Sequence, residues 1–462
     1  MKDKGKAWYA DRDDRIDRMQ DVKQSYKDFV VGILIQSNEP TYPHQVMILV
    51  TLNILARWCR RIIVQVPNFN FDLPGFYKGN SRAVIEQILL QSDPQINVQF
   101  KSLDESSVDC TLSIGLPDEL KRDSYWIESI GWLAGCGKGG ARRSNEIQIS
   151  THKSNIIGAL FAAGLGNAAV FRMANGLDSQ SEYQIWHSLF DFETNESERN
   201  LNNPPIPSSV DLGRVHLVGC GAIGSSLSFL LGLTDWSFDI SLIDFDHVGF
   251  PNCSSSLAFS YDDALKQRSK TTVCEGLLKK FGKTNVKSFE SDYATFLTDH
   301  GTMADVVLCL ANENSVWSSI QNNYPPIVLH ATTNKNWGTN FGRHIPLKEW
   351  CIMCRFEDEI EGNFVPVCSE VELIPKDSKK ELLGILPFLA TSSAVIMLAE
   401  LGKLGSAGYP FNDNFIEFST RIPLGNFVKY QVKPKPCYVC KGQSPELYRK
   451  LLATRRFAES YL

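Results

Sequence analysis

The sequence has no long uninterrupted apolar run and no apolar leader. A transmembrane helix needs about 20 consecutive apolar residues, and the most apolar run, residues 156–171, contains Gly158, Gly164, Gly166 and Asn167. The opening stretch, MKDKGKAWYADRDDR, is charged and lacks the apolar segment of about 7–15 residues that a secretory signal requires. We therefore expect a cytoplasmic protein with no membrane partner.

Positive charge is not in excess either. Lys and Arg number 47 against 52 Asp and Glu, which gives a net charge of -5. Proteins that bind nucleic acid usually carry a basic surplus, so nucleic acid is not an expected partner. Hydrophobic residues make up 43% and charged residues 21% of the 462 residues, which excludes a disordered or fibrous chain.

Cysteine, by contrast, is abundant, with 12 residues. In a long chain without a secretory signal, cysteines are more often reduced thiols, metal ligands or nucleophiles than disulfides. Two C-x-x-C pairs are present, Cys351 with Cys354 and Cys437 with Cys440. Four thiolates form a closed tetrahedral zinc site. We expect a structural Zn2+ that joins two distant segments, and reduced cysteines without a metal are the alternative.

The order of apolar runs predicts an α/β fold with two Rossmann-like, doubly wound domains. We expect a degenerate domain over residues 1–205 and a nucleotide-binding domain over residues 206–462, because residues 191–211 have the composition of an exposed connection. The strands expected in the two halves are 29–36, 62–66, 96–100, 108–114, 214–218, 240–244, 306–311 and 326–331. The helices expected are 11–27, 44–61, 155–165, 225–233, 267–280 and 389–404.

A glycine motif opens the second half. Gly219, Gly221 and Gly224 form G-x-G-x-x-G between a predicted strand and a predicted helix, and Asp244 ends the next predicted strand. Glycines allow the backbone to approach a phosphate at the helix N-terminus, and an acidic residue at that spacing can bind ribose hydroxyls. The motif therefore predicts a nucleotide site, and the alternative is a glycine turn that only packs the helix closely.

Further residues follow this motif in a familiar order. The stretch VGCGAIGSSLSFLLGLTDWSFDISLIDFDHVGFPN, which contains Asp246 and Asn252 and is followed by Lys270 at the start of a predicted helix, resembles the adenylation domain of ubiquitin-activating enzymes. It is also similar to the bacterial enzymes that adenylate the thiamin and molybdopterin sulfur carriers. The C-x-x-C pairs resemble the structural zinc site of this family. The resemblance covers about residues 212–442 in several pieces.

The resemblance implies a reaction and a set of roles. The C-terminal carboxylate of a ubiquitin-like β-grasp protein would attack the α-phosphate of ATP, with Mg2+ near the developing charge. Asp244 would hold the ribose, Asp246 and Asn252 would lie by the phosphates and the metal, and Lys270 would neutralise phosphate charge. A solvated helix lysine is the alternative for Lys270.

A transfer cysteine is implied as well. Asn363-Phe-Val-Pro-Val-Cys368 resembles the stretch that carries this cysteine in activating enzymes for ubiquitin-like modifiers, which pass the modifier to a conjugating enzyme. A thiolate suits this step because cysteine is more nucleophilic than serine at neutral pH. Several acidic residues near Cys368 would raise its pKa, so a structural or idle cysteine is an equal alternative, and Cys253 is the second candidate.

The first half lacks a phosphate loop of its own. Its corresponding turn, QSNEPTYP at 36–43, contains no glycine, so its backbone cannot cradle a phosphate in the same way. This resembles the inactive adenylation half of ubiquitin-activating enzymes, whose N-terminal helix sends an arginine into the partner's ATP site. Arg12-Asp-Asp-Arg15 is similar to that segment, and Arg15 is the candidate arginine; a solvated charged helix is the alternative.

Two positions depart from the family pattern. Ser255 stands where the family usually carries an arginine, and the Mg2+-binding aspartate after the later strand is replaced in Leu310-Ala311-Asn312. We include Asn312 in the expected nucleotide site. Arg268 is a candidate replacement for the lost cation, and Asp246 is a candidate for holding the metal alone.

The favoured hypothesis is a single-chain activating enzyme that resembles those of bacterial ubiquitin-like conjugation systems, some of which serve antiviral defence. A sulfur-carrier adenylyltransferase is the second hypothesis, although such enzymes are usually homodimers of one-domain subunits. A catalytically dead scaffold that binds a β-grasp protein is the third. A nicotinamide dehydrogenase is the fourth, and the zinc pairs, Asp246, Asn252 and Lys270 disfavour it. The oligomeric state stays open.

Overall fold

The structure is a computed structural model. It describes the backbone of residues 2–117, 124–140, 155–178, 182–206, 209–301, 303–349, 351–354, 384–404, 413–432 and 437–461. It describes the side chains of these residues except 2–7, 105, 314, 438, 440, 460 and 461.

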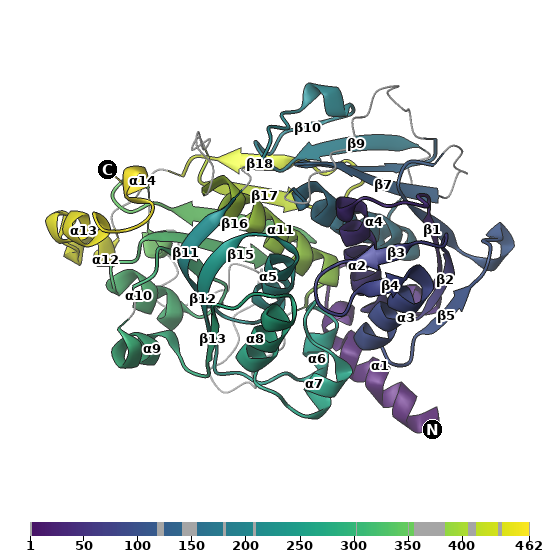
Figure 1. Cartoon of the computed structure of the whole chain (residues 1–462), viewed down its shortest axis with the longest axis horizontal. Helices are drawn as coiled ribbons and strands as arrows, with labels where there is room; N and C mark the ends of the chain where they lie inside the picture. The colour runs from purple at the N-terminus through teal and green to yellow at the C-terminus, as the bar shows by residue number, and fades with distance from the viewer. Residues whose placement is uncertain are drawn as a thin grey trace.

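The first half of the described chain forms one mixed eight-stranded sheet (Figure 1). Five neighbouring strands run parallel: β5 (Asn97–Phe100), β2 (Arg61–Gln65), β1 (Val30–Ile35), β6 (Cys110–Ile114) and β7 (Ser124–Ile130). The sheet continues antiparallel through β8 (Leu133–Lys138), β9 (Tyr183–Ser188) and β10 (Thr194–Asn195). A separate hairpin pairs β3 (Asn70–Asp72) with β4 (Lys78–Asn80).

The second half repeats this order of strands. Its parallel strands are β13 (Val286–Phe289), β12 (Ser237–Ile243), β11 (Asp211–Val218), β14 (Val306–Cys309) and β15 (Ile327–Thr333). Its antiparallel strands are β16 (Gly338–His344), β17 (Phe415–Ser419) and β18 (Phe427–Tyr430). In each sheet the first strand in sequence lies between the second and the fourth, and this order confirms the predicted fold class.

Helices cover both sheets. Those of the first half are α1 (Lys2–Asp17), α2 (Tyr42–Ala56), α3 (Ser81–Ser92) and α4 (Ile157–Ala174), with short 3-10 helices η1 (Gln24–Asp28), η2 (Glu105–Ser107) and η3 (Glu198–Asn200). Those of the second half are α5 (Ala222–Leu233), α6 (Phe250–Cys253), α7 (Tyr261–Leu265), α8 (Lys270–Lys280), α9 (Tyr293–His300), α10 (Asn314–Asn322), α11 (Pro387–Leu404), α12 (Tyr438–Gly442), α13 (Pro445–Leu452) and α14 (Ala458–Tyr461).

Three of the predicted helices end at clearly different residues in the structure, and the one predicted at 44–61 ends at Ala56, before strand β2 begins at Arg61. The first helix ends at Asp17 rather than Lys27, and Asp21 has a φ of 59°, which an α-helix cannot include. The helix predicted at 155–165 extends to Ala174, although the sequence contains glycines there. Gly158 and Gly164 lie inside α4 and let it pack closely on other elements. A Cβ on Gly158 would lie 2.2 Å from the Leu133 carbonyl oxygen, and a Cβ on Gly164 would lie 2.8 Å from Ser392 Oγ.

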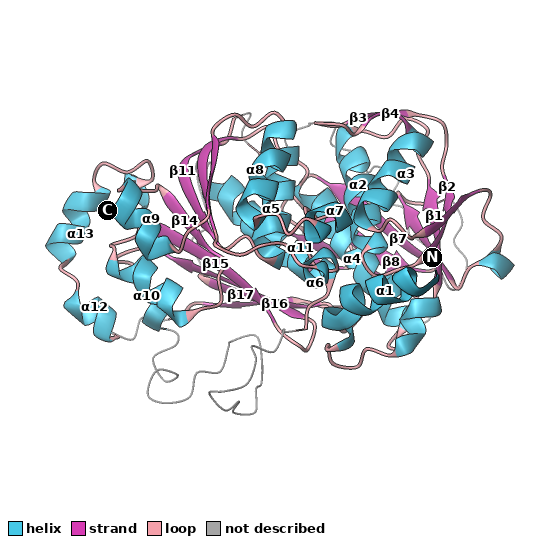
Figure 2. Cartoon of the chain, turned by 90° about the horizontal axis from the view of Figure 1, so that it is seen from below, coloured by secondary structure: helices cyan, strands magenta, loops and turns pink. Residues whose placement is uncertain are grey.

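The helices α4 and α11 lie between the two sheets and join the halves (Figure 2). Each is long and apolar enough to cross a membrane by length and composition, but 94% of α4 and 100% of α11 is buried inside the molecule. They pack on each other, α4 also packs on α2 and β7, and α11 also packs on α5 and β15. Both halves therefore share one continuous hydrophobic core.

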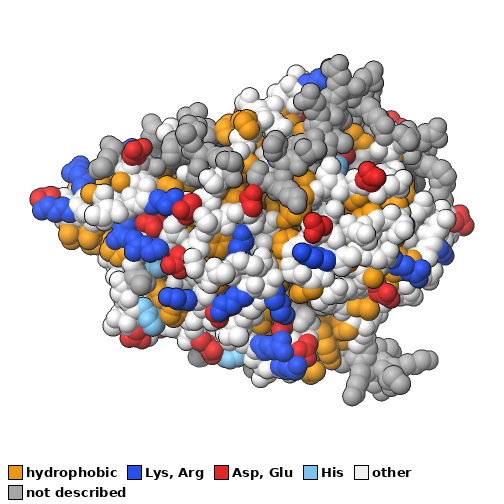
Figure 3. Space-filling model, in the orientation of Figure 1, with side chains coloured by type: hydrophobic (Ala, Val, Ile, Leu, Met, Phe, Trp, Pro, Cys, Tyr) orange, Lys and Arg blue, Asp and Glu red, His pale blue; other side chains and the backbone are white. Residues whose placement is uncertain are grey.

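Charged side chains are mixed on the molecular surface. Figure 3 shows Lys and Arg interspersed with Asp and Glu over one face, with apolar side chains between them. The described residues on this face thus form no extended patch of one charge. This distribution agrees with the small net charge of -5.

Candidate functional site

A cavity of about 280 Å³ opens at the carboxyl ends of β11, β12 and β14. In open parallel sheets, this edge is where ligands bind. The expected site residues that line it are Arg15, Gly219, Gly221, Asp244, Asp246, Asn252, Lys270 and Asn312. The structure thus gathers into one cavity residues that the sequence separates by almost 300 positions; their roles toward a nucleotide stay predictions.

The glycines shape the turn between β11 and α5. Gly219 has a φ of +97°, and a Cβ there would lie 2.7 Å from the Ala311 nitrogen, so the turn needs glycine. Gly224 lies behind the cavity, where its missing side chain lets α5 pack against the Gly219 carbonyl. Gly221 is the N-cap of α5 and has open space at its Cβ position. An anion can therefore approach the free N–H groups of this helix end.

Asp244 is fixed by the backbone of the glycine turn. Its Oδ2 accepts a 2.6 Å hydrogen bond from the Cys220 N–H, and its Oδ1 accepts one of 2.8 Å from the Asp246 N–H. Burial raises the pKa of Asp244, against the charge of Lys270 and these backbone hydrogen bonds, which lower it. The carboxyl group therefore holds the turn in shape and faces the cavity.

Lys270 and Asp246 form an ion pair across the cavity. The Lys270 Nζ lies 2.7 Å from Asp246 Oδ2, and the two side chains are 9% and 54% exposed. The largely buried lysine is therefore not the solvated helix residue of the alternative interpretation. Asn252 lies beside them and caps α6, where its Oδ1 accepts the Gly249 N–H at 2.8 Å.

Arg15 reaches the cavity from the first half. Helix α1 packs on α6 and α7, with the Trp8 ring 5.8 Å from that of Phe250 and 5.0 Å from that of Tyr261. This contact carries Arg15 into the cavity lining, where its Nη1 lies 3.5 Å from Ser255 Oγ. Arg15 therefore brings a cation beside Ser255, the position at which the resemblance led us to expect an arginine.

The hypothesis that Arg268 replaces the lost cation is wrong. Its guanidinium lies 2.6 Å from Asp263 and 3.0 Å from Asp262, and Arg268 lines a different cavity. The sequence alone did not show which of Arg15 and Arg268 lies beside Ser255, because that depends on the tertiary fold.

The cavity also contains residues that the sequence analysis missed. Asp292 and Glu313 lie at the starts of α9 and α10 and bring two more carboxyl groups to the lining. The Asp292 carboxylate accepts the N–H groups of Ala294 and Thr295 as an N-cap, and the hydrogen bonds from Thr295 lower its pKa. Glu313 lies two residues after the strand predicted at 306–311, which was the available signal for it, whereas no strand was predicted before Asp292.

Thr332 was missed for a different reason. It belongs to β15, lines the cavity, and carries a buried hydroxyl without a hydrogen-bond partner in the described structure. A threonine within an apolar strand gives no signal in the sequence. A buried unpaired hydroxyl indicates room for a polar ligand group.

The corresponding turn of the first half is filled by side chains. His44, at the start of α2, hydrogen-bonds Thr41 Oγ1 at 2.9 Å and Glu128 Oε1 at 2.7 Å. Gln36 Nε2 donates to Ser113 Oγ at 3.0 Å. Polar side chains thus occupy the place where the second half has its glycine turn.

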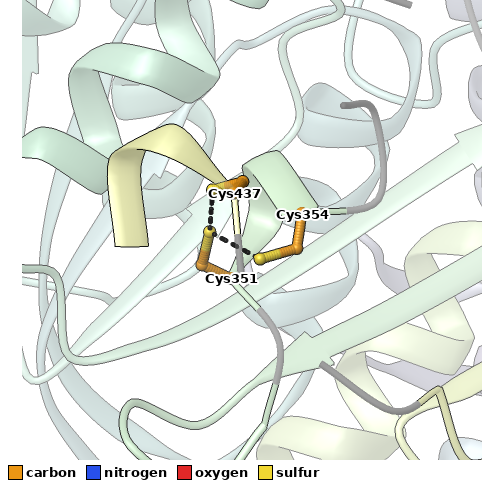
Figure 4. Close-up of side chains that lie close together, drawn as sticks. All are labelled: Cys351, Cys354 and Cys437. Atoms are coloured by element: carbon orange, nitrogen blue, oxygen red, sulfur yellow. Dashed lines mark hydrogen bonds between the residues drawn. The ribbon is translucent and has the colours of Figure 1, made fainter. Parts of the chain in front are cut away.

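Three of the four expected zinc ligands lie together (Figure 4). Cys351 Sγ is 3.5 Å from the Sγ atoms of Cys354 and Cys437, and all three lie within 4.8 Å of one another. Tetrahedral zinc with Zn–S bonds of ~2.3 Å separates thiolates by a similar distance. Cys440 belongs to α12, three residues after Cys437, and its side chain is outside those described. The three thiols therefore fit zinc.

The candidate nucleophiles differ in what the structure says of them. Cys368 lies outside the described residues. Cys253 is fully buried, its Sγ donates to the Ser260 carbonyl at 3.4 Å, and burial raises its pKa to about 12. A thiol in this state is a poor nucleophile at neutral pH, which weakens the case for the second candidate.

No protein-family model matches the sequence, and no curated protein matches it. Among solved structures, E. coli MccB with MccA-N7isoASN is 20% identical with a TM-score of 0.38, over 49% of this chain and 66% of that one. E. coli MccB with ATP is 20% identical with a TM-score of 0.37, over 50% of this chain and 67% of that one. The chain spans about two thirds of the MccB chains that it matches. Similarity at this level carries no argument about activity, so the proposal that follows depends on the cavity itself.

Proposed function

We propose that this protein activates the C-terminal carboxylate of a small protein or peptide by adenylation with ATP. The observation that carries the proposal is the single cavity that combines a glycine turn at a helix N-terminus, Asp244, the Lys270–Asp246 pair and Arg15. In the proposed reaction, a carboxylate oxygen bonds to the α-phosphorus of ATP as the bond to pyrophosphate breaks. The products are an acyl-adenylate and pyrophosphate.

Each side chain of the cavity has its own proposed role in this reaction. Asp244 would accept the ribose hydroxyls, and the N–H groups beside Gly221 would bind phosphate oxygens. Lys270 would exchange its bond to Asp246 for one to a phosphate, and Arg15 would add a second cation. Asp246, Asn252 and Asn312 offer oxygen ligands of the kind that Mg2+ prefers, and Mg2+ when bound would neutralise phosphate charge.

The thiol cluster is proposed to hold one structural Zn2+ through Cys351, Cys354, Cys437 and Cys440. A set of four thiolates leaves no coordination position for a substrate. The metal would therefore join the segment after β16 to helix α12 and take no part in nucleotide chemistry.

Pyrophosphate exchange tests the adenylation step. With its modifier present, the protein should incorporate labelled pyrophosphate into ATP. Lys270→Ala or Asp246→Ala should lower the rate at least about 100-fold, because the first removes a cation from the phosphates and the second removes an oxygen ligand of Mg2+. Lys266→Ala is the matched control, since this lysine is 55% exposed and pairs with Asp262. Equal rates in all three variants would remove Lys270 and Asp246 from the reaction.

The finer proposal is that the acyl group belongs to a ubiquitin-like β-grasp protein and passes to Cys368. The Cys368 thiolate would bond to the acyl carbon as AMP leaves, and the thioester would then be handed to a conjugating enzyme. The modifier should form an adduct that a thiol reductant releases, and Cys368→Ala should lose the adduct but keep pyrophosphate exchange. Loss of the adduct in Cys253→Ala instead would contradict this assignment.

A scaffold without catalysis is the second candidate, favoured by Ser255 and Ala311 at the two positions that depart from the family pattern. It predicts that the modifier binds but that no pyrophosphate exchange occurs. Sulfur-carrier activation would be recognised by a thiocarboxylate at the C-terminus of the modifier. The cytoplasm is the proposed location, and a bacterial ubiquitin-like conjugation system is the proposed context.

A further inference from the structure

A second cavity, of about 360 Å³, lies where the two halves meet. The first half contributes residues from α2, α3 and the segment after β3, and the second half contributes residues from α5, α7 and α8. Figure 1 shows α3 and α8 on either side of this junction. The segment from Asn252 to Ser260 borders both cavities, because Asn252 lines the first cavity and Leu257 and Ser260 line the second. Only the segment from Asn252 to Ser260 connects this second cavity with the proposed adenylation site.

A buried positive charge lines this cavity. Arg57 is 2% exposed and donates to Asn53 Oδ1 and to the carbonyl oxygens of Cys253, Leu257 and Phe259 at 2.6–3.0 Å. These hydrogen bonds are one fewer than the N–H donors of a guanidinium. No carboxylate among the described residues forms an ion pair with Arg57. Burial lowers the pKa of Arg57 to about 10, so the residue stays charged at neutral pH.

The lining has a surplus of positive charge. Arg57, Arg268 and Lys280 face one acidic residue, Asp263. Asp263 is already engaged, because its carboxylate accepts bonds from Arg268 and from the hydroxyl of Ser260. A buried charge without a counter-charge is unfavourable. Asp262, just outside the lining, also lies 3.0 Å from Arg268, so the surplus is one positive charge. An anion would balance it.

The remaining walls combine aromatic side chains with polar ones such as Gln91 and Thr272, and they leave open space. Phe76, Tyr77, Phe229 and Phe259 line the cavity, and the Lys280 ammonium lies 5.7 Å from the centre of the Phe76 ring. Gly276 is in the middle of α8, where glycine costs about 1 kcal/mol relative to alanine. A Cβ on it would meet no atom within 4 Å, so protein packing does not require glycine there.

We propose that this cavity binds a small aromatic phosphate monoester. The phosphate would lie between Arg57 and Lys280, and the flat ring would lie among Phe76, Tyr77 and Phe259. A phosphate monoester carries about 1.5 to 2 negative charges at neutral pH, so it would compensate the unpaired positive charge of the lining. A ring fits the aromatic walls, since offset and edge contacts between rings are favourable.

Calorimetric titration with phenyl phosphate tests this site on the full chain, without ATP. The titration uses Lys270→Gln protein, so that the first cavity has lost its lysine and any failure is separate from that of the adenylation proposal. We expect one saturable site per chain. Adding Lys280→Gln should weaken binding about tenfold, whereas Lys279→Gln should change it less than twofold, because Lys279 pairs with Glu275 and does not line the cavity.

A second variant tests the space rather than the charge. Gly276→Met should extend a side chain into the cavity and also weaken phenyl phosphate binding at least about tenfold, while the melting temperature stays at or above that of the parent protein. The absence of saturable binding, or equal weakening by Lys279→Gln and Lys280→Gln, would overturn the proposal. Binding of inorganic phosphate as tight as that of phenyl phosphate would overturn the aromatic part of the assignment.

Discussion

Arg12 and Arg15 lie three residues apart on α1 and have different surroundings. The Arg12 side chain is fully buried, pairs with Asp13 at 2.6 Å and Asp93 at 2.7 Å, and donates to the carbonyl oxygens of Ala56 and Trp58. Arg15 faces the first cavity beside Ser255. Burial lowers the pKa of Arg15 to about 10, so it stays charged at neutral pH. Arg12 therefore stabilises the fold, whereas Arg15 lines the first cavity.

Replacing each arginine should separate these roles. Arg15→Ala should lower pyrophosphate exchange at least about tenfold, because a cation near the phosphates is lost. Arg12→Ala should lower the free energy of unfolding by about 3–5 kcal/mol, because Asp13 and Asp93 would stay buried with less compensation. Chemical denaturation and exchange assays on both variants provide the measurement. Unchanged exchange in Arg15→Ala would contradict its assignment to the phosphates.

Residues in sequence motifs were predictable, and residues placed only by the tertiary fold were not. Gly219 and Asp244 follow a pattern whose spacing depends on one strand, one helix and the next strand, and Lys270 was identified through the family resemblance. Arg57 and Thr332 lie within an apolar helix and an apolar strand, where nothing in the local sequence distinguishes a cavity side chain from a packed one. Whether Arg57 and Thr332 line a cavity depends on which helices and strands pack together, and a short stretch of sequence does not contain that information.

The same distinction holds for strands. The parallel strands β1 and β14 are short apolar runs, which the sequence identifies. Strand β7, which is parallel to β6, and the antiparallel strand β8 are equally buried, but β7 contains a glutamate and β8 contains a lysine and glycines. Glu128 of β7 is paired with His44, and a Cβ on Gly137 of β8 would lie 2.4 Å from the Trp126 ring nitrogen. Partners distant in sequence compensate these residues, so local composition did not predict the strands.

The zinc site connects two elements and gives a prediction at that scale. Purified protein should contain one zinc per chain, and Cys437→Ser should lower both zinc content and thermal stability, because structural metal binding contributes to folding. Cys274→Ser is the matched control: Cys274 is also buried, but it lies on α8, away from the thiol cluster. Elemental analysis and thermal denaturation give the two readouts. Protein that is fully folded, purified without chelator and free of zinc would refute the assignment.

At the scale of the whole molecule, the two halves depend on each other. Besides the α4–α11 contact, Arg57 of α2 holds the segment that follows α6 through three carbonyl oxygens. Arg172 of α4 likewise donates to the Thr420 carbonyl at 2.7 Å, and in the other direction Trp337 Nε1 donates to the Gln20 carbonyl at 2.8 Å. The first half thus supplies Arg15 to the cavity and supports the loop that carries Asn252, without a nucleotide loop of its own.

This shared core predicts that the chain unfolds as one unit, although its two sheets repeat one topology. The division at residues 205 and 206 stays a prediction, and cutting there should expose the faces of α4 and α11 that now pack on each other. Residues 206–462 expressed alone should be insoluble or partly folded, and co-expression with residues 1–205 should restore soluble protein. Calorimetry of the intact chain should give one transition with equal calorimetric and van't Hoff enthalpies. Two separate transitions would show that the first half is not required for the second half to fold. A soluble second half with pyrophosphate exchange of its own would show that the first half is not required for the site, and would remove Arg15 from the mechanism.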